Sequence, residues 1–567
     1  MYNQSRKRVD NMNQLPCSEY PRPQMKRESY LCLNGEWNFS IYGEKRNENG
    51  KVIVPFSIES KLGGNREVLK PNETLMMEKD FEIPDGFNIG RVLLHFDAVD
   101  GQSKIWINDH LAGESECGYL PIVLDITNVL KEVNHICMVI HDPSDSGAQL
   151  RGKQSLHPKG IWYSAQSGIW QSVWLESVPV DYIESLKITP YFDEKYVEIF
   201  VKTNTSGKVC ISCGKQSIKG ESNAALHLHL DEMHPWTPEN PYLYDLDVTF
   251  KEDHVTSYFG MRKFSVMKDH EGVMRLFLNN RPYFQSGLLD QGYNSEGLMS
   301  WKDDQMMIDD IQLAKSMGFN MLRKHIKIEP LRWYYHCDRL GMLVWQDMIN
   351  GGSHYNLLTI SSPLITNIHF KDSHYRLFGR KDEHERKRFL EQLKGMIDHL
   401  YNCVSISMWV IFNEGWGQFD SSKALMLVQK WDPTRVIDPT SGWHDQKMGD
   451  FKSWHVYFKP YKFKKDTLGR CVILSEFGGY QWAINDVKKS FGYKRMESQK
   501  ELEENLVQLY EKQIIPAKRL GLSACVYTQL SDVESEVNGL VSYDRKTVKI
   551  QTEVMKKINE RLKDDEK

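Results

Sequence analysis

The chain has 567 residues, and its 72 basic and 76 acidic side chains give a formal net charge of -4. This balance disfavours a nucleic-acid binder, which normally carries a basic excess, and 40% hydrophobic with 26% charged residues excludes a disordered chain. Ten cysteines are too few for a disulfide scaffold, no apolar run approaches the ~20 residues of a membrane span, and the polar start lacks a secretory signal. We therefore expect a cytoplasmic protein with no membrane or nucleic-acid partner.

Short strands dominate the sequence up to about residue 265. Each strand is either apolar throughout or alternates apolar with polar residues over four to six positions. Turn residues such as Asp85-Gly86 separate the strands. This pattern is typical of antiparallel sandwiches. A boundary near Pro179 predicts an N-terminal jelly-roll sandwich over residues 1–179 and an immunoglobulin-like sandwich over residues 180–265. The clearest predicted strands are residues 52–55, 91–96, 104–108, 122–126, 136–140, 171–176, 196–201, 208–212, 225–230 and 244–250.

After residue 265, strands alternate with helices. Apolar stripes and end signals predict helices over residues 307–317, 330–341 and 389–400. The first of these has Asp303 or Asp304 as its N-terminal cap and ends at Gly318.

Eight strands are predicted between and around these helices. Eight βα units in roughly 300 residues are typical of a (β/α)8 TIM barrel, which we expect over residues 266–567. An open doubly wound sheet is the alternative, but it normally brings a Gly-rich phosphate loop, and the sequence has none. The predicted barrel strands are residues 282–288, 320–323, 342–346, 404–412, 435–439, 453–457, 471–476 and 523–529.

Two of these strands end in a glutamate. The fourth runs into Asn413 and Glu414, and the seventh runs into Glu476. A carboxylate at the end of an apolar strand needs an ion-pair partner or a catalytic reason. Strands four and seven lie on opposite sides of a barrel, so the two carboxylates can face each other across its mouth, about 5–5.5 Å apart as in a retaining glycosidase. The alternative is that each glutamate only pairs with a Lys or Arg.

Five short strings carry a resemblance to a known family. They are LNGEWNF from Leu33, SGIWQSVWLE from Ser167, YFGMRK from Tyr258, NEGW from Asn413 and SEFG from Ser475. Together and in this order they resemble glycoside hydrolase family 2, which contains β-galactosidases, β-glucuronidases and β-mannosidases. The resemblance implies the same order of domains: jelly-roll sandwich, immunoglobulin-like sandwich and catalytic barrel.

The resemblance implies catalytic roles for the two glutamates. Glu476 matches the family's nucleophile, and Glu414 matches its acid/base. We expect repulsion between the two carboxylates to raise the pKa of Glu414. Asn413 matches the residue that binds the sugar's 2-hydroxyl, and Arg323 and Tyr457 match the groups that hold the nucleophile. The remaining candidate sugar ligands are His325, Asp290, Gln291, His455 and Trp443.

The sugar is harder to predict than the chemistry. Family β-glucuronidases grip the substrate carboxylate with an Asn-x-Lys motif, but this chain has Leu540 after Asn538-Gly539. Lys324 and Lys327 could replace that cation, although we expect both to be solvated. We therefore expect a retaining exo-β-glycosidase that is first a β-galactosidase, with a β-glucuronidase or β-mannosidase of the same family as the alternative.

We expect no cofactor and no obligatory metal, because the acidic residue that ends strand three, Asp347, lacks the His spacing of the family's magnesium sites. A homo-oligomer is compatible with the leading sandwiches. The competing hypothesis from another class is a carbohydrate-binding protein with an inactive barrel, which predicts loss of at least one of the two glutamates.

Overall fold

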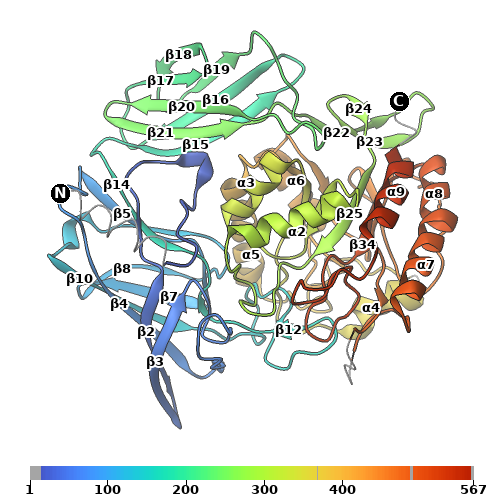
Figure 1. Ribbon diagram of the computed structural model, residues 1–567, viewed down its shortest axis with the longest axis horizontal. Helices are drawn as coiled ribbons and strands as arrows, with labels where there is room; N and C mark the ends of the chain where they lie inside the picture. Colours follow the sequence, from blue (N-terminus) through green and yellow to red (C-terminus); the bar gives the residue numbers. More distant parts are fainter. Residues whose placement is uncertain (1–14, 367, 485–489, 564–567) are drawn as a thin grey trace.

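The computed structural model describes residues 15–366, 368–484 and 490–563. Two β-sandwiches lie on one side of a barrel, and helices α7 (Gln499–Leu509), α8 (Ile515–Leu520) and α9 (Thr552–Lys563) cover the opposite side (Figure 1). No helix of the described residues is long and apolar enough to span a membrane. The start of the chain, on which the expectation about a secretory signal rests, lies outside the described residues.

The first sandwich packs a four-stranded sheet against a six-stranded sheet. The first sheet has the order β1 (Leu31–Cys32), β14 (Val173–Val178), β5 (Arg91–Phe96) and β9 (Ile122–Asp125). The second has the order β3 (Arg46–Val54), β2 (Gly35–Gly43), β4 (Thr74–Glu82), β10 (Val133–His141), β7 (Gln102–Ile107) and β8 (His110–Ser115). Alternate residues of β10 are buried, as expected for strands with one face on a core. The predicted strands of this region are confirmed.

The second sandwich has seven strands, the number in a small immunoglobulin-like domain. One sheet is β15 (Ile183–Tyr191), β16 (Tyr196–Thr203) and β19 (Ala225–His229). The other is β18 (Gln216–Glu221), β17 (Lys208–Cys213), β20 (Tyr244–Phe250) and β21 (Asp253–Phe259). A three-stranded sheet of β22 (Phe264–Lys268), β23 (Met274–Leu278) and β24 (Arg281–Pro282) then leads into the barrel.

The eight predicted barrel strands all form, and they make one parallel sheet. In sheet order they are β29 (Val436–Asp438), β28 (Ile406–Val410), β27 (Leu343–Asp347), β26 (Met321–Lys324), β25 (Gln285–Asp290), β34 (Leu522–Thr528), β31 (Cys471–Gly478) and β30 (Phe451–Val456). Strands in this order form a barrel that is nearly closed between β29 and β30. The alternative fold, an open doubly wound sheet, is therefore excluded.

The helices around the barrel depart from eight regular units. The three predicted helices are present as α2 (Asp304–Ser316), α3 (Leu331–Leu340) and α5 (Glu383–Leu400), and Asp303 is the cap of α2, accepting a hydrogen bond from the backbone N–H of Met306. Helices α4 (Leu357–Ile365) and α6 (Ser421–Trp431) were not predicted, and neither were α7, α8 and α9. Residues 439–450 and 457–470, which follow β29 and β30 and are all described, contain no helix.

Alternation along the strands divides the barrel into two cores. Met321 packs in the core inside the barrel, with side chains from β22 and β23, and its neighbour Leu322 packs outward among the helices. Leu289 and Leu288 divide in the same way on β25. The side chain that follows Leu322, Arg323, therefore points inward toward the C-terminal mouth.

Gly341, at the end of α3, gives a test of how the barrel meets the second sandwich. Its φ is +73°, and a Cβ there would lie 2.4 Å from the carbonyl oxygen of Pro238. We expect Gly341→Ala to lower the free energy of unfolding by about 2–4 kcal/mol, through backbone strain plus this clash. The control is Gly469→Ala, where φ is +75° but a Cβ would meet no atom within 4 Å. Equal losses in denaturant titrations of the two variants would contradict the clash.

Candidate active site

The C-terminal mouth of the barrel holds a small cavity. Most of its walls come from residues at or just after strand ends, where barrel active sites lie. One wall comes from the first sandwich and contains Lys153, Ile161 and Trp162. The barrel residues that line it are Leu289, His325, Asn350, Asn413, Glu414, Trp416, Tyr457, Glu476, Tyr493, Thr528 and Glu536.

Glu414 lies on a tight turn after β28. Its φ is +52°, a left-handed conformation that is rare for a residue with a side chain and that clusters at functional sites. The backbone N–H of Glu414 donates to the carbonyl of Ser441 at 2.9 Å, and the turn closes with a bond from Trp416 N–H to the carbonyl of Asn413 at 3.0 Å. Burial raises the pKa of Glu414 to about 7. The shift has the predicted direction, but its largest cause is burial rather than the neighbouring carboxylate.

A β-bulge sets the position of Glu476 on β31. Leu474 pairs with Cys525 and Phe477 pairs with Tyr527, so two residues of β31, Ser475 and Glu476, lie opposite one residue of β34. Such bulges re-aim a side chain and are frequent next to active sites. Tyr457 donates a hydrogen bond to one carboxylate oxygen of Glu476, and Arg323 donates to the other at 3.1 Å.

Arg323 organises the floor of the site. Its guanidinium is fully buried and donates to Glu476, to Asn413 Oδ1 at 2.8 Å and to Asp347 Oδ1 at 3.0 Å. Asp347 also contacts His325 Nδ1 at 2.7 Å. Burial lowers the pKa of His325 well below its ordinary value, so the ring is neutral at pH 7. These contacts fix the directions of the side chains that face the cavity.

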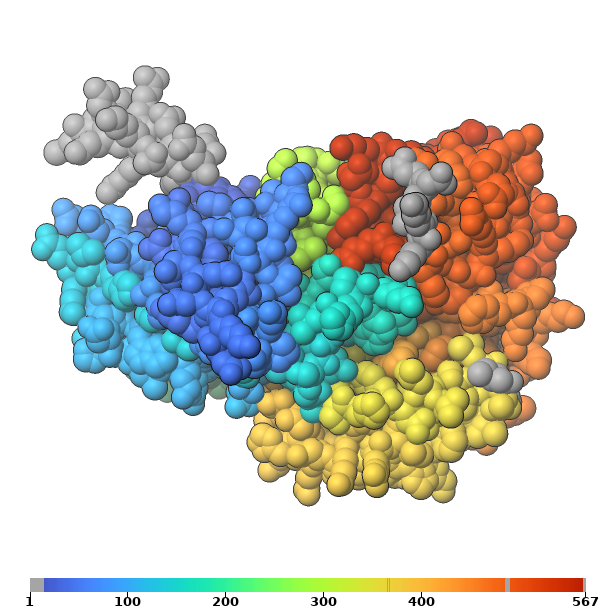
Figure 2. Space-filling model, turned by 90° about the horizontal axis from the view of Figure 1, so that it is seen from below, coloured from blue at the N-terminus to red at the C-terminus, as the bar shows by residue number. Residues whose placement is uncertain are grey.

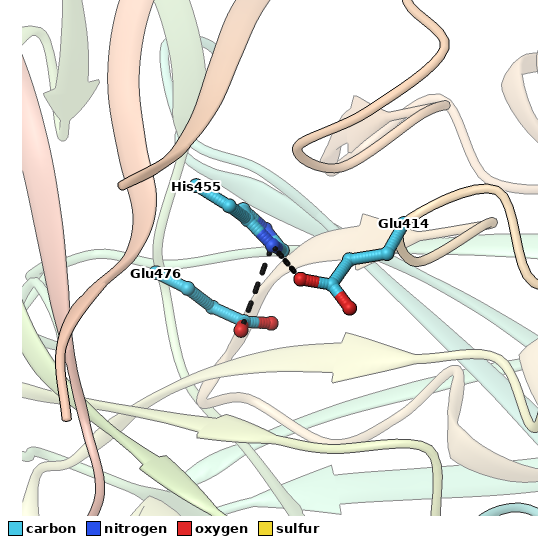
Figure 3. Close-up of side chains that lie close together, drawn as sticks. All are labelled: Glu414, His455 and Glu476. Carbon is cyan, nitrogen blue, oxygen red and sulfur yellow. Dashed lines mark hydrogen bonds and ion pairs between the residues drawn. The ribbon is translucent and has the colours of Figure 1, made fainter. Parts of the chain in front are cut away.

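His455 lies between the two glutamates (Figure 3). Its Nδ1 is 2.7 Å from Glu414 Oε1 and 3.5 Å from Glu476 Oε2. Burial lowers the pKa of His455 to about 4, so the ring carries one proton at neutral pH. Arg323 Nη1, which can only donate, faces the ring's Nε2 at 3.4 Å, and this places the proton on Nδ1, toward Glu414. His455 thus contacts both glutamates instead of forming part of the cavity wall.

Three other predicted sugar ligands lie away from the cavity lining. Asp290 is buried and pairs with Lys324 at 2.6 Å, and Gln291 donates to Gln529 at 2.7 Å. Trp443 packs in a separate apolar cluster with Ile360 and Phe378. Asp290 and Gln291 are bound to other protein side chains and Trp443 packs among apolar ones, so we do not propose these three residues as sugar ligands.

The prediction that Lys324 and Lys327 are solvated is wrong. Both side chains are buried, and both pair with Glu329 at 2.8 Å. Two lysines three positions apart at a strand end resemble an exposed helix start, but here the first sandwich covers the segment: Gln171 donates to the carbonyl of Ile328, and Lys327 faces the Trp170 ring. They form an internal ion network and do not line the cavity.

Sequence reasoning missed the wall that comes from outside the barrel. Lys153, Ile161 and Trp162 belong to a loop-rich segment of the first sandwich, and Tyr493 and Glu536 belong to loops after β31 and β34. Trp416 lies in the NEGW string from Asn413 but was not among the predicted site residues. Nothing in the local pattern of Lys153, Ile161 and Trp162 marks them, because only the packing of the sandwich on the barrel brings them to the cavity.

Family models match most of the chain. The model described as "Glycosyl hydrolases family 2, TIM barrel domain" matches residues 274–563, and the model described as "Glycosyl hydrolases family 2" matches residues 182–262. The chain belongs to glycosyl hydrolase family 2. The order of two sandwiches and a barrel expected from the family resemblance is therefore confirmed.

Among family 2 relatives, a β-galactosidase of Leuconostoc mesenteroides is 24% identical over 505 residues, covering 78% of this chain and 46% of that protein. A β-galactosidase of Thermoanaerobacter pseudethanolicus is 23% identical and covers 64% and 48%. The chain spans about half the length of these curated relatives.

Solved structures of similar size share the fold. A β-D-glucuronidase from Dictyoglomus thermophilum has a TM-score of 0.72 at 17% identity and covers 96% of this chain and 98% of that one. A β-galacturonidase from Eisenbergiella tayi has a TM-score of 0.71 at 18% identity, covering 95% and 97%.

Among the described residues, Glu414, His455 and Glu476 are the group whose ligand atoms lie close enough to hold a metal ion, all within 4.8 Å of one another. The Arg323 guanidinium already neutralises Glu476, however, and would repel a second cation. We therefore expect dialysis against EDTA to leave kcat/KM on the best nitrophenyl glycoside unchanged. A loss of activity that Mg²⁺ or Mn²⁺ restores would contradict this expectation.

Proposed function

We propose that this chain is a retaining exo-β-glycosidase that cleaves a terminal β-linked sugar by double displacement. The observation that carries the proposal is the pair Glu414 and Glu476, which lie across one cavity with an oxygen of each within 4.8 Å. Retaining glycosidases need carboxyl groups about 5–5.5 Å apart, whereas inverting ones need about 6.5–9.5 Å to admit a water. A non-catalytic sugar-binding barrel gives no reason for this pair.

In the first step Glu476 acts as the nucleophile. A carboxylate oxygen of Glu476 bonds to the anomeric carbon while the bond from that carbon to the leaving oxygen breaks. Arg323 and Tyr457 hold Glu476 in position by donating to its two oxygens. Asn413 uses its Oδ1 to accept from Arg323, which leaves its N–H₂ group to donate to the sugar's 2-hydroxyl.

Glu414 supplies the proton in the first step and removes one in the second. With a pKa of about 7, it is largely protonated at slightly acid pH and can protonate the leaving oxygen. It then takes a proton from the water that attacks the anomeric carbon, and Glu476 leaves as a carboxylate. Because His455 Nδ1 donates to Oε1, the acidic proton of Glu414 resides on Oε2.

Two sugars are candidates for the site. A β-galactoside comes first because curated relatives that match 78% and 64% of this chain are named β-galactosidases. A β-uronide comes second, and one observation favours it: Lys153 places a cation in the cavity wall, where a sugar carboxylate could pair with it.

The deciding experiment measures both specificity and stereochemistry. Initial rates on 4-nitrophenyl β-galactoside, β-glucuronide, β-galacturonide, β-mannoside and β-glucoside give the sugar, and proton NMR of the first-formed product gives the anomer. The proposal expects one preferred sugar and a β-anomer as first product. An α-anomer would exclude double displacement, and no turnover of any β-glycoside would favour the sugar-binding hypothesis.

A further inference from the structure

His455 offers one hydrogen-bond donor to two carboxyl groups. Its Nδ1 is 2.7 Å from Glu414 Oε1 and 3.5 Å from Glu476 Oε2, and Figure 3 shows the ring between the two glutamates. Only the shorter distance is that of a full hydrogen bond, since N–H···O bonds span about 2.7–3.2 Å. A neutral imidazole has a single N–H, so the proton that faces both glutamates is bonded to Glu414.

The backbone around the ring fixes its position. The register of β30 on β31 shifts directly before His455, so that His455 pairs with Glu476. Ser441 Oγ lies 3.1 Å from Nε2 and donates to it, because that nitrogen carries no proton. A Cβ on Gly442, whose φ is +84°, would lie 2.5 Å from Cγ of the ring, so only glycine lets the chain pass this closely.

A segment of the first sandwich helps to cover this group. The side chain of His455 is 0% exposed, and those of Glu476 and Glu414 are 5% and 12% exposed. Trp162 of the sandwich packs edge-on against Trp416, with the ring centroids 5.5 Å apart, and both line the cavity. Figure 2 shows the teal part of the chain, to which this segment belongs, between the blue sandwich and the red and yellow parts of the barrel. In a site of such low dielectric, hydrogen bonds to a charged group are stronger than in water.

The proposed reaction moves a negative charge from one neighbour of His455 to the other. At slightly acid pH, Glu476 is ionised and Glu414 is protonated before the first step; afterwards Glu476 is a neutral ester and Glu414 is a carboxylate. The hydrogen bond from His455 to Glu414 therefore becomes charge-assisted during the step, which makes such a bond about twice as strong. An interaction that is stronger in the transition state than in the ground state lowers the barrier.

We propose that His455 is a positioning residue whose Nδ1–H stabilises the carboxylate that Glu414 becomes in the first step. No proton leaves the ring. The proton of Glu414 passes from Oε2 to the leaving oxygen as Glu476 bonds to the anomeric carbon and the bond from that carbon to the leaving oxygen breaks. The inference rests on the proposed glycosidase function and deepens it, because it gives the acid/base a partner that binds its charged form more strongly than its neutral form.

The contact from His455 is the shortest one that Glu414 receives. Among the described residues, two side chains hydrogen-bond to its carboxyl group: His455 at 2.7 Å and Trp416 at 3.4 Å. Burial raises the pKa of Glu414 to about 7. The other charged or titratable groups that face Glu414 are Lys153, Arg323, Tyr457 and Tyr493.

The test compares His455→Leu, which removes the donor, with His455→Asn, whose Nδ2 is bonded to Cγ as Nδ1 is and can donate to Glu414. His227→Leu is the matched control, because His227 also faces a glutamate, Glu198 at 3.1 Å, but is 47% exposed on the second sandwich. The substrates are the methyl and dinitrophenyl β-glycosides of the preferred sugar. We expect His455→Leu to lower kcat/KM on the methyl glycoside at slightly acid pH by roughly 10- to 100-fold, the effect of one charge-assisted hydrogen bond.

The dinitrophenyl glycoside leaves without a proton, so its kcat/KM should change little, and His455→Asn should restore part of the activity on the methyl glycoside. A hydrogen bond to the charged form of a group lowers its pKa. Loss of the donor should therefore raise the pKa of Glu414 and move the alkaline limb of kcat/KM upward. Equal losses on the two substrates, or an alkaline limb that stays in place, would overturn the proposal.

Infrared spectra of the carboxyl band as a function of pH give the pKa of Glu414 without turnover, with Glu414→Gln identifying the band. If His455→Leu raises this pKa but the wild type cleaves no glycoside, the glycosidase proposal fails while the stabilising bond from His455 stands. If the wild type cleaves glycosides and the pKa is the same in both proteins, the glycosidase proposal stands and the role of His455 fails. Should thermal melts show that His455→Leu is unfolded, His455→Gln, whose amide lies one bond farther from Cβ, replaces it.

Discussion

Replacing Glu476 with alanine is expected to lower kcat by roughly 10⁴- to 10⁶-fold, the range found when a nucleophile that acts as part of a unit is removed. Among the described residues that line the cavity, the other carboxylates are Glu414, the proposed acid/base, and Glu536, which accepts hydrogen bonds from Tyr163 and Asn538. The measurement is single-turnover and steady-state hydrolysis of the preferred nitrophenyl glycoside. The matched control is Glu511→Ala, which changes a surface glutamate that is 44% exposed.

A chemical rescue makes this prediction specific for a nucleophile. Azide that enters the space left by Glu476→Ala attacks the anomeric carbon from the side of the missing carboxylate, so the product should be an α-glycosyl azide. A β-glycosyl azide from this variant would mean that Glu476 is the acid/base instead. Full activity of the variant would remove Glu476 from the chemistry.

Replacing Glu414 with glutamine is expected to slow cleavage of glycosides with poor leaving groups by about 10²- to 10⁴-fold, because the leaving oxygen then departs without a proton. A dinitrophenyl glycoside needs no such help, so its first step should continue and release a burst of phenolate. The second step should still be slow, because no base activates the water. A variant that slows both classes of leaving group equally would contradict the role of Glu414.

The Glu414→Gln variant also tests the pH dependence of kcat/KM. Glu414 has a pKa raised from its ordinary value to about 7, and the acid form is the active one in the first step. In the wild type, kcat/KM should therefore fall as the pH rises through about 7, and this limb should vanish in Glu414→Gln. The control is Glu504→Gln, which changes a carboxylate that is 60% exposed and should leave the limb in place. An alkaline limb that persists in Glu414→Gln would assign it to another group.

The sequence by itself predicted the barrel strands and the polar residues that follow them. Mainly apolar runs of four to nine residues identified all eight barrel strands, because a strand buried on both faces leaves a nearly continuous apolar signal. Polar residues directly after such runs, above all Glu414 and Glu476, stand out against that signal for the same reason. Arg323 and Tyr457 were found from family resemblance at matching strand ends, and the structure places both on Glu476.

Only the tertiary structure decided which of the polar side chains at strand ends contact one another, and which side chains from other parts of the chain join them in the cavity. A bulge that turns Glu476 inward depends on pairing with β34, and the burial that raises the pKa of Glu414 depends on loops far away in the chain. For the same reason Asp290 and Lys324 looked like free strand-end side chains but pair with each other beneath the first sandwich. Lys153 lies more than a hundred residues from any barrel strand, and only the docking of the sandwich brings its charge to the cavity. Periodicity reports which face of an element is buried, but it does not report which partner buries it.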